Sequence, residues 1–244
     1  MSTISHIKKQ MSQIIQALKD IKQLPYYKNE AAGSELGEKY ARHEEAISRV
    51  LEANNFTRKL LPLNPHTGRR FSYPLVKRTH WMDHPEECTT LDIGQFIEQP
   101  FGSQQSPDFI IKVSNDFILF LEAKSSKELF PTYNSCIPHQ NYVYVFTSKK
   151  TNQTTLYKGE RIVTLEQEKL LKEYIEESRK RDEEFNKRLM DVTVDTNHRG
   201  IQFYTRPMII QKGGKEYVDY FTHSQREQAE NAVFEWVKKQ SLSE

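Results

Sequence analysis

Two apolar runs separated by a short polar break form the clearest hydrophobic pattern in the chain. The runs are Phe109 to Val113 and Phe117 to Leu121, and Ser114-Asn115-Asp116 separates them. Both runs are rich in β-branched and aromatic residues, whereas Ser, Asn and Asp favour turns, so the pattern predicts a β-hairpin. The second run is apolar on both faces, which is typical of a central strand that is covered on both sides.

The length of the polar break predicts which residues of the hairpin face each other. A three-residue loop centred on Asn115 pairs Val113 with Phe117 and places Asp108 opposite Glu122. Opposed Cβ atoms lie only about 4.5–5.5 Å apart, so two such carboxylates repel unless a proton or a cation lies between them. Because side chains alternate along a strand, Lys124 shares a face with Glu122.

Helical periodicity is found before and after the hairpin. Apolar residues recur at three- and four-residue steps from Ile4 to Ile21, which predicts an amphipathic helix that ends before Pro25. A second helix is predicted from Leu36 to Asn54. A long, highly charged helix is predicted from Leu165 to Met190, and the capping box Thr164-Leu165-Glu166-Gln167 opens it.

Further strands are predicted after the hairpin. Tyr142 to Thr147 is a clear strand, and Thr154 to Tyr157 is expected to pair with it. Shorter strands are predicted at 192–196, 201–204 and 208–211. Together these elements predict an α/β fold, in which a mixed central β-sheet contains the hairpin and is flanked by helices, with α+β elements in the C-terminal part.

Composition narrows the class of protein further. The 244 residues carry a net charge of only +2, so a nucleic-acid partner would have to be recognised by local rather than global positive charge. No run of about 18 apolar residues predicts a membrane span. The N-terminal residues lack the apolar core of a secretory signal, and the two cysteines, Cys88 and Cys136, suggest free thiols, so a cytoplasmic location is expected.

The acidic residues of the hairpin suit a divalent metal. Mg²⁺ prefers carboxylate oxygens, water and phosphate oxygens, which matches Asp108 and Glu122. Pro107-Asp108 followed by Glu122-Ala123-Lys124 resembles the motif of the PD-(D/E)xK nuclease superfamily. With the flanking Ser103 to Ser106 and Ser125-Ser126, the chain looks most similar to type II restriction endonucleases.

The resemblance implies a restriction-endonuclease-like fold and Mg²⁺-dependent hydrolysis of double-stranded DNA at a specific short sequence, leaving 5′-phosphate ends. It implies Asp108, Glu122 and Lys124 as catalytic residues, with the metal held by the two acids and the backbone carbonyl of Ala123. Members of the superfamily often use a further acid on a preceding helix, which binds the metal through water. Glu44 is the position that resembles it, and Glu45 is the alternative.

The resemblance also suggests an organisation of the chain. A single domain is expected over 1–244. Within it, the N-terminal helix region 1–35 is a candidate for the interface of a homodimer, which palindromic DNA recognition would favour. The segment 57–101 is expected to be a loop-rich insertion, and 190–244 a C-terminal α+β subregion that could recognise DNA.

Residues that could contact DNA are basic or polar and lie on the predicted loops and strand ends. Each of them could equally be an ordinary surface residue. They are Arg69, Arg70, Lys77, Arg78, Ser126, Asn134, His139, Gln140, Asn141, Arg199 and Arg206.

Other interpretations of the same residues remain open. Glu122 and Lys124 could form a structural ion pair worth about 0–1 kcal/mol. The fold could serve DNA repair or junction resolution, or bind DNA or another partner without cleavage. His80, His84 and Cys88 have a metal-like spacing, but Pro85 interrupts the helix and no fourth ligand is apparent, so the sequence does not predict a zinc site there.

Overall fold

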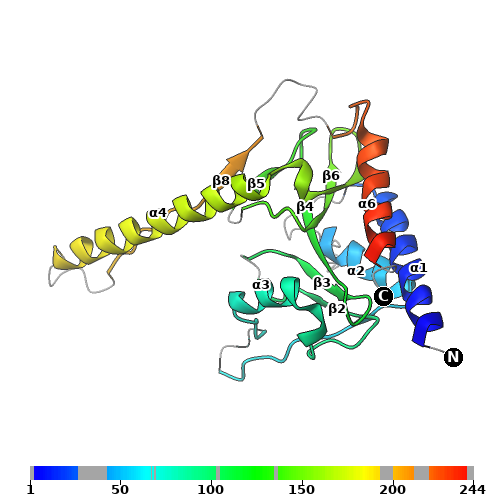
Figure 1. Ribbon diagram of the computed structural model, residues 1–244. Helices are drawn as coiled ribbons and strands as arrows, with labels where there is room; N and C mark the ends of the chain where they lie inside the picture. Colours follow the sequence, from blue (N-terminus) through cyan, green and yellow to red (C-terminus); the bar gives the residue numbers. More distant parts are fainter. Residues whose placement is uncertain are drawn as a thin grey trace, which may run out of the picture.

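A six-stranded mixed sheet forms the centre of the protein, with helices on both of its faces (Figure 1). The computed structural model describes residues 3–26, 43–66, 68, 70–102, 105–134, 137–192, 200–211 and 220–240. The strands lie in the order β1-β2-β3-β4-β6-β7. Their bounds are Thr57–Arg58, Gln95–Glu98, Phe109–Lys112, Ile118–Ser126, Val143–Ser148 and Gln153–Lys158.

The hairpin register expected from the loop length is confirmed. Phe109 pairs with Leu121 and Lys112 pairs with Ile118 in the antiparallel ladder of β3 and β4. The backbone N–H of Val113 donates to the carbonyl of Phe117, which closes the three-residue loop around Asn115. Because this register continues to the next pair, Asp108 and Glu122 lie opposite each other.

The strand pair after the hairpin is also confirmed. β6 and β7 are antiparallel, and Tyr144 pairs with Tyr157. β6 lies parallel to β4, so the strand that carries Glu122 has neighbours on both sides. The short 3-10 helix η2 (Gly159–Arg161) follows β7.

The segment 57–101, which was expected to be a loop-rich insertion, has loops that separate four short elements. This segment contributes β1 and β2 to the central sheet, and it also contains helix α3 (Leu75–Asp83) and the 3-10 helix η1 (Pro85–Glu87). β2 has only two apolar residues, Phe96 and Ile97, so its local pattern is too short to indicate a strand. β2 forms a strand because its backbone pairs with that of β3.

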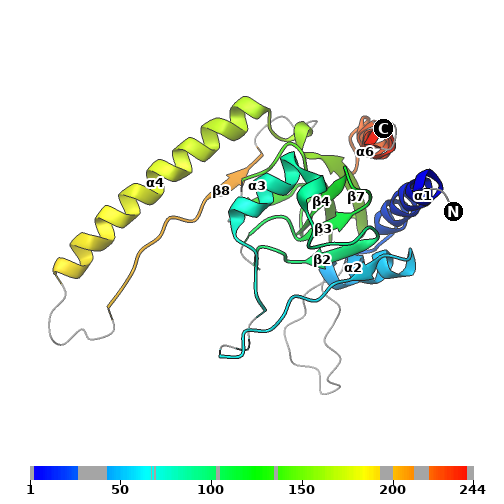
Figure 2. The same ribbon diagram turned by 60° about the horizontal axis from the view of Figure 1, so that its bottom comes forward.

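Three helices cover one face of the sheet: α1 (Thr3–Lys22), α2 (His43–Ala53) and α6 (Arg226–Gln240). The apolar stripe of α1, including Ile14, Leu18 and Ile21, is fully buried within this chain. Figure 2 shows α1 and α6 on the same side of the sheet, with α3 away from them. The second helix, which was expected from residue 36, begins at His43 within the described residues.

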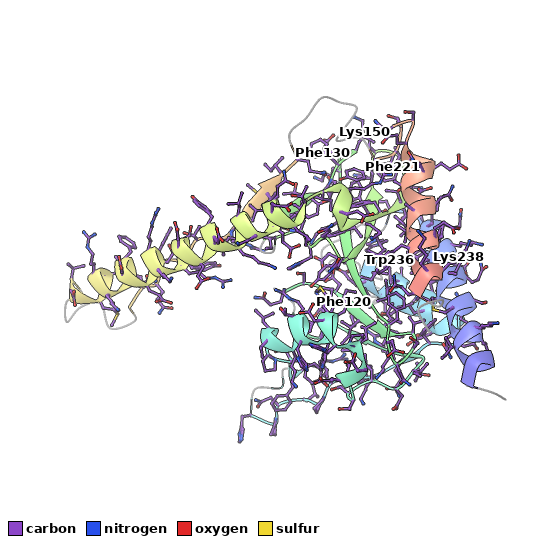
Figure 3. All side chains as sticks on the ribbon, in the orientation of Figure 1. Phe120, Phe130, Lys150, Phe221, Trp236 and Lys238 are labelled. Atoms are coloured by element: carbon purple, nitrogen blue, oxygen red, sulfur yellow. The ribbon has the colours of Figure 1, made fainter. Side chains whose placement is uncertain are left out.

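The alternation of side chains along β4 divides the core into two layers. Leu119 and Leu121 point into the layer beneath α1, α2 and α6, whereas Phe120 belongs to an aromatic layer that includes Trp81 of α3. In Figure 3, Trp236 lies on the α6 side of the sheet and Phe120 lies towards α3. β4 is therefore covered on both faces, as its uniformly apolar sequence predicts.

A long helix projects from the body of the protein as an arm (Figure 1). Helix α4 (Leu165–Asp191) begins with the expected capping box: Thr164 and Gln167 each accept a hydrogen bond from the other's backbone N–H. Residues 200–207 run along it in an extended conformation and lead into β8 (Met208–Ile210), which pairs with β5 (Thr132–Asn134).

The predicted short strands of the C-terminal part are only partly confirmed. β8 matches the expectation for 208–211, but 201–204 contacts α4 and forms no strand. Most of 192–196 lies outside the described residues. None of the helices in the described ranges has the length and apolar character needed to cross a bilayer.

Candidate active site

Asp108 and Glu122 converge at the open end of the β3–β4 pair. The carboxylate of Glu122 accepts a hydrogen bond from the backbone N–H of Asp108 through Oε2, at 3.1 Å. In return, Oδ2 of Asp108 accepts from the backbone N–H of Ala123 at 2.8 Å. Each acid is therefore positioned by the strand that carries the other, so the hairpin register itself sets the geometry of the pair.

Lys124 is the third member of this cluster. Its Nζ lies 2.5 Å from Oε1 of Glu122, as expected for two residues on the same face of β4. The lysine side chain is mostly buried, and Glu122 is 5% exposed. The three residues predicted to be catalytic therefore lie together on the face of the sheet that also carries the aromatic layer.

Burial makes it costly for both acids to be ionised. Burial and the charge of Glu122 raise the pKa of Asp108 well above its usual value, against the lowering effects of Lys124 and the Ala123 N–H. Burial also raises the pKa of Glu122, although Lys124 and the Asp108 N–H oppose it. One lysine therefore does not fully offset two buried carboxylates, which leaves a local demand for additional positive charge.

Glu44, in the first turn of α2, brings a third negative charge close to the two acids. Its charge raises the pKa of both Asp108 and Glu122. Glu45 instead forms ion pairs with Arg58 at 3.2 Å and with Arg49 at 3.5 Å. Of the two alternatives for an additional acid, Glu44 is thus the one that acts on the acid pair.

These residues fit a bound Mg²⁺ ion. The donor set consists of hard carboxylate oxygens, and a divalent cation between two facing acids would favour their ionised forms. Asp108 and Glu122 would hold the ion, with Glu44 acting through water. The carbonyl of Ala123 stays a predicted ligand from β4, whose register pairs Ala123 with Val145.

A group of buried tyrosines lies behind the acids in the aromatic layer. Tyr144 of β6 pairs in register with Glu122, and its hydroxyl accepts from the backbone N–H of His139 at 2.9 Å. Its ring stacks on that of Tyr157, with centroids 5.4 Å apart. Burial and the charge of Glu122 raise the pKa of Tyr144, so its phenol stays uncharged.

Arg78 of α3 contacts the segment that leads into Asp108. Its Nη1 donates to the carbonyl of Ser106 at 3.0 Å. The side chain is half-buried. Arg78 was predicted to contact DNA, and the structure gives it a second role, because it ties α3 to the residues immediately before the acid pair.

His139 and Gln140 form a structural contact with the start of α4. His139 is buried, and its Nδ1 lies 2.9 Å from Oε1 of Glu168, whose Oε2 accepts from the backbone N–H of Gln140 at 3.0 Å. Although burial raises the pKa of Glu168, the hydrogen bonds from His139 and Lys172 lower it to about 2. Burial lowers the pKa of His139. A buried imidazole held in this way is not placed to read bases.

The remaining residues predicted to contact DNA are dispersed. Lys77 is exposed on α3, and Ser126 caps the end of β4 by accepting from the backbone N–H of Glu128. Asn141 is exposed beside Met82 of α3. Arg70, Asn134 and Arg206 are exposed on a loop, on β5 and on the arm respectively. Arg69 and Arg199 lie outside the described residues.

Sequence reasoning did not find the charged network beside the site. Arg58 of β1 forms an ion pair with Glu98 of β2 as well as with Glu45, and Ser48 of α2 donates to Glu98 at 3.3 Å. These residues hold α2 against the edge of the sheet and so position Glu44. The network depends on β1 and β2, whose short sequences give almost no strand signal.

Comparisons with protein-family models, curated proteins and solved structures gave no match to this chain.

Proposed function

We propose that this protein is a Mg²⁺-dependent endonuclease of the type II restriction class, which hydrolyses phosphodiester bonds of double-stranded DNA. The observation that carries the proposal is the acid pair: the half-buried Asp108, just before β3, and the buried Glu122 of β4 each accept a hydrogen bond from the other's strand, with the ammonium group of Lys124 2.5 Å from Glu122. A structural ion pair would need one acid and not two. The second acid is explained if the pair holds a cation.

The residues of the site have separate tasks in this reaction. Asp108 and Glu122 would hold the ion, which when bound would lower the pKa of a water and offset charge on the phosphate. Lys124 orients the attacking water and stabilises negative charge that develops on the phosphate oxygens. The water loses a proton to solvent as its oxygen bonds to phosphorus, the bond from phosphorus to the 3′ oxygen breaks, and that oxygen takes up a proton from solvent. One water is consumed, and a 5′-phosphate and a 3′-hydroxyl remain.

The architecture around the site supports the same proposal. The acids lie on a hairpin at the centre of a mixed sheet with helices on both faces, as expected for a restriction-endonuclease-like fold. Arg78, Lys77 and Asn141 lie on or beside α3, which adjoins the segment leading into Asp108. A DNA backbone at the site would meet these side chains first. A homodimer and a cytoplasmic location belong to the same proposal.

Digestion of a sequenced plasmid with Mg²⁺ tests the proposal. Discrete fragments with uniform 5′-phosphate ends are expected from the wild-type protein, and Asp108→Asn is expected to cleave at least about 10³-fold more slowly. Asp116→Asn, in the exposed hairpin loop, is the matched control and should cleave normally.

Three outcomes would contradict the proposal in different ways. Undiminished cleavage by Asp108→Asn would exclude this site. A smear, or a preference for branched DNA, would indicate another PD-(D/E)xK nuclease. Salt-dependent DNA binding without any cleavage would indicate a catalytically silent DNA-binding protein.

A further inference from the structure

Four metal-ligating side chains come together on the surface where α3 ends and η1 begins. His80 lies in the last turn of α3 and His84 directly follows that helix, with ring centroids 5.3 Å apart. Nε2 of His80 lies 2.7 Å from Oε2 of Glu87, and Nδ1 of His84 lies 3.5 Å from Oε1 of Glu86. Ligand atoms of His84, Glu86 and Glu87 all lie within 4.8 Å of one another.

The backbone explains why these side chains converge. The N–H of His84 still donates to the carbonyl of His80 at 2.7 Å, so the two imidazoles keep the one-turn spacing of a helix. Pro85 then starts the 3-10 helix η1, in which the N–H of Glu87 donates to the carbonyl of His84 at 3.1 Å. The proline therefore ends α3 and also directs Glu86 and Glu87 back towards the histidines.

We propose that His80, His84, Glu86 and Glu87 form a binding site for a divalent transition-metal ion of the Zn²⁺ type. Two imidazoles and two carboxylates make a four-ligand set that such ions accept, whereas Mg²⁺ prefers oxygen ligands alone. Tetrahedral bonds of about 2.0–2.2 Å place ligand atoms about 3.3 Å apart. The His80–Glu87 and His84–Glu86 distances lie on either side of this value, whereas ligand atoms of His84, Glu86 and Glu87 are up to 4.8 Å apart. His80 reaches this group of three through Glu87, and the side chains are exposed enough to move closer around an ion.

Cys88 is not a member of this site, despite its spacing in the sequence. It is fully buried with Trp81 and Leu91 in the aromatic layer, and its backbone carbonyl accepts from Nζ of Lys112 at 2.6 Å. The third and fourth ligands would therefore come from Glu86 and Glu87, which the sequence pattern did not include. Glu86 and Glu87 reach the histidines because η1 begins at Pro85, directly after His84.

The metal would add a side-chain link between α3 and η1, which His84 already connects along the chain. Without the ion, the histidine–glutamate pairs are largely exposed and add little to stability. With it, the end of α3 would be fixed to η1, and α3 also carries Arg78, which contacts Ser106. The site is separate from the Asp108–Glu122 pair and does not depend on the proposed nuclease activity.

Calorimetric titration of Zn²⁺ into the untagged full-length protein tests this proposal. Saturating Mg²⁺ is present throughout, so that the oxygen ligands of Asp108 and Glu122 are occupied. We expect one bound Zn²⁺ per chain and a higher Tm, because an ion that binds only the folded state stabilises it.

Variants then assign the ligands. His80→Ala and His84→Ala should each weaken Zn²⁺ binding by about tenfold or more, and the double variant should lose it. His66→Ala, an exposed histidine outside the cluster, is the control and should bind as the wild type does. Asp108→Asn should also bind Zn²⁺ normally, which separates this site from the proposed active site.

Two results would overturn the proposal. One is the absence of Zn²⁺ binding by the wild-type protein. The other is Zn²⁺ binding that persists in the double histidine variant, since the ion would then be bound elsewhere. Circular dichroism of each variant establishes that a loss of binding does not reflect unfolding.

Discussion

Lys124 with Glu122 and Lys180 with Glu176 are both lysine–glutamate pairs, but they lie in opposite surroundings. In the sheet, the side chains of Lys124 and Glu122 are 15% and 6% exposed and 2.5 Å apart. On the arm, those of Lys180 and Glu176 are 71% and 73% exposed and 3.9 Å apart. Charges in the sheet interact through a low dielectric, whereas those on the arm are screened by water and salt. The same residue types can therefore support chemistry in one place and only solvation in the other.

The two regions also differ in how their elements are held together. The sheet is stabilised by apolar layers on both faces. The arm consists of α4 and an extended segment, and side chains of the helix hold that segment through its backbone. We therefore expect changes in the body to have large effects and changes in the arm to have small ones.

Removing one lysine from each region gives the largest expected contrast. If the protein is the proposed nuclease, Lys124→Ala should reduce DNA cleavage about 10²–10³-fold, because it removes the ammonium group proposed to stabilise charge at the reacting phosphate. Lys180→Ala should leave cleavage unchanged. The measurement is the single-turnover rate on a plasmid substrate with Mg²⁺. Equal rates for the two variants would contradict the role of Lys124.

A buried acid in the body should contribute far more to stability than an exposed one on the arm. Glu230 of α6 is 2% exposed and contacts Lys22 at 2.5 Å, Arg226 at 3.0 Å and Thr155 at 2.8 Å. Glu230→Ala leaves these partners uncompensated, so the free energy of unfolding should fall by about 3 kcal/mol.

Glu176→Ala on the arm is the matched change and should cost at most about 0.5 kcal/mol. Urea unfolding of both variants measures the difference. A similar loss of unfolding free energy in the two variants would show that burial does not make Glu230 more important for stability than Glu176.

Much of this contrast can be read from the sequence, because it depends on local patterns. The three-residue break around Asn115 predicts the register that brings Asp108 to Glu122, and the confirmed ladder of β3 and β4 agrees with it. The capping box at Thr164 and the charged sequence after it likewise predict an exposed helix. In both places, neighbouring residues alone determine the structure.

Other features depend on residues that are distant in the sequence. β2 becomes a strand because β3 pairs with it, and Glu98 then meets Arg58 and Ser48 from two other elements. His139, which the sequence presents as a polar loop residue, is buried by Glu168 of α4. No local sequence pattern contains this information. The residues that surround and position the acid pair were therefore less predictable than the two acids themselves.

The acid pair should make the body less stable when Mg²⁺ is absent, which is the next largest effect. The pKa values of Asp108 and Glu122 are raised, so the folded state binds more protons than the unfolded state between the ordinary carboxyl pKa and the raised values. Stability in EDTA should therefore fall as pH rises through this window, and the loss should be complete above the raised pKa values.

Asp108→Asn removes one of the two charges and can still accept the Ala123 N–H. Above that window its Tm in EDTA should exceed that of the wild type, while Mg²⁺ should raise the Tm of the wild type only. Thermal unfolding across pH, with and without Mg²⁺, provides the test. A variant that is less stable than the wild type at every pH would show that the acids stabilise the fold as a structural pair.

The smallest expected effect concerns the attachment of the extended segment to the arm. Asp182 of α4 accepts hydrogen bonds from the backbone N–H and the hydroxyl of Thr205, and Asn186 exchanges two with the backbone of Phe203. Asp182→Ala should cost about 1 kcal/mol, because these bonds are exposed to water and α4 has its own helical hydrogen bonds.

Amide hydrogen exchange measures this change locally. Exchange at Thr205 should accelerate in Asp182→Ala, while amides of β4 should keep the protection they have in the wild type, since stability is distributed by region. Glu183→Ala, the adjacent exposed acid, is the control and should leave Thr205 unchanged. If the β4 amides also exchanged faster, the arm and the sheet would unfold as one unit, and the division between them would be wrong.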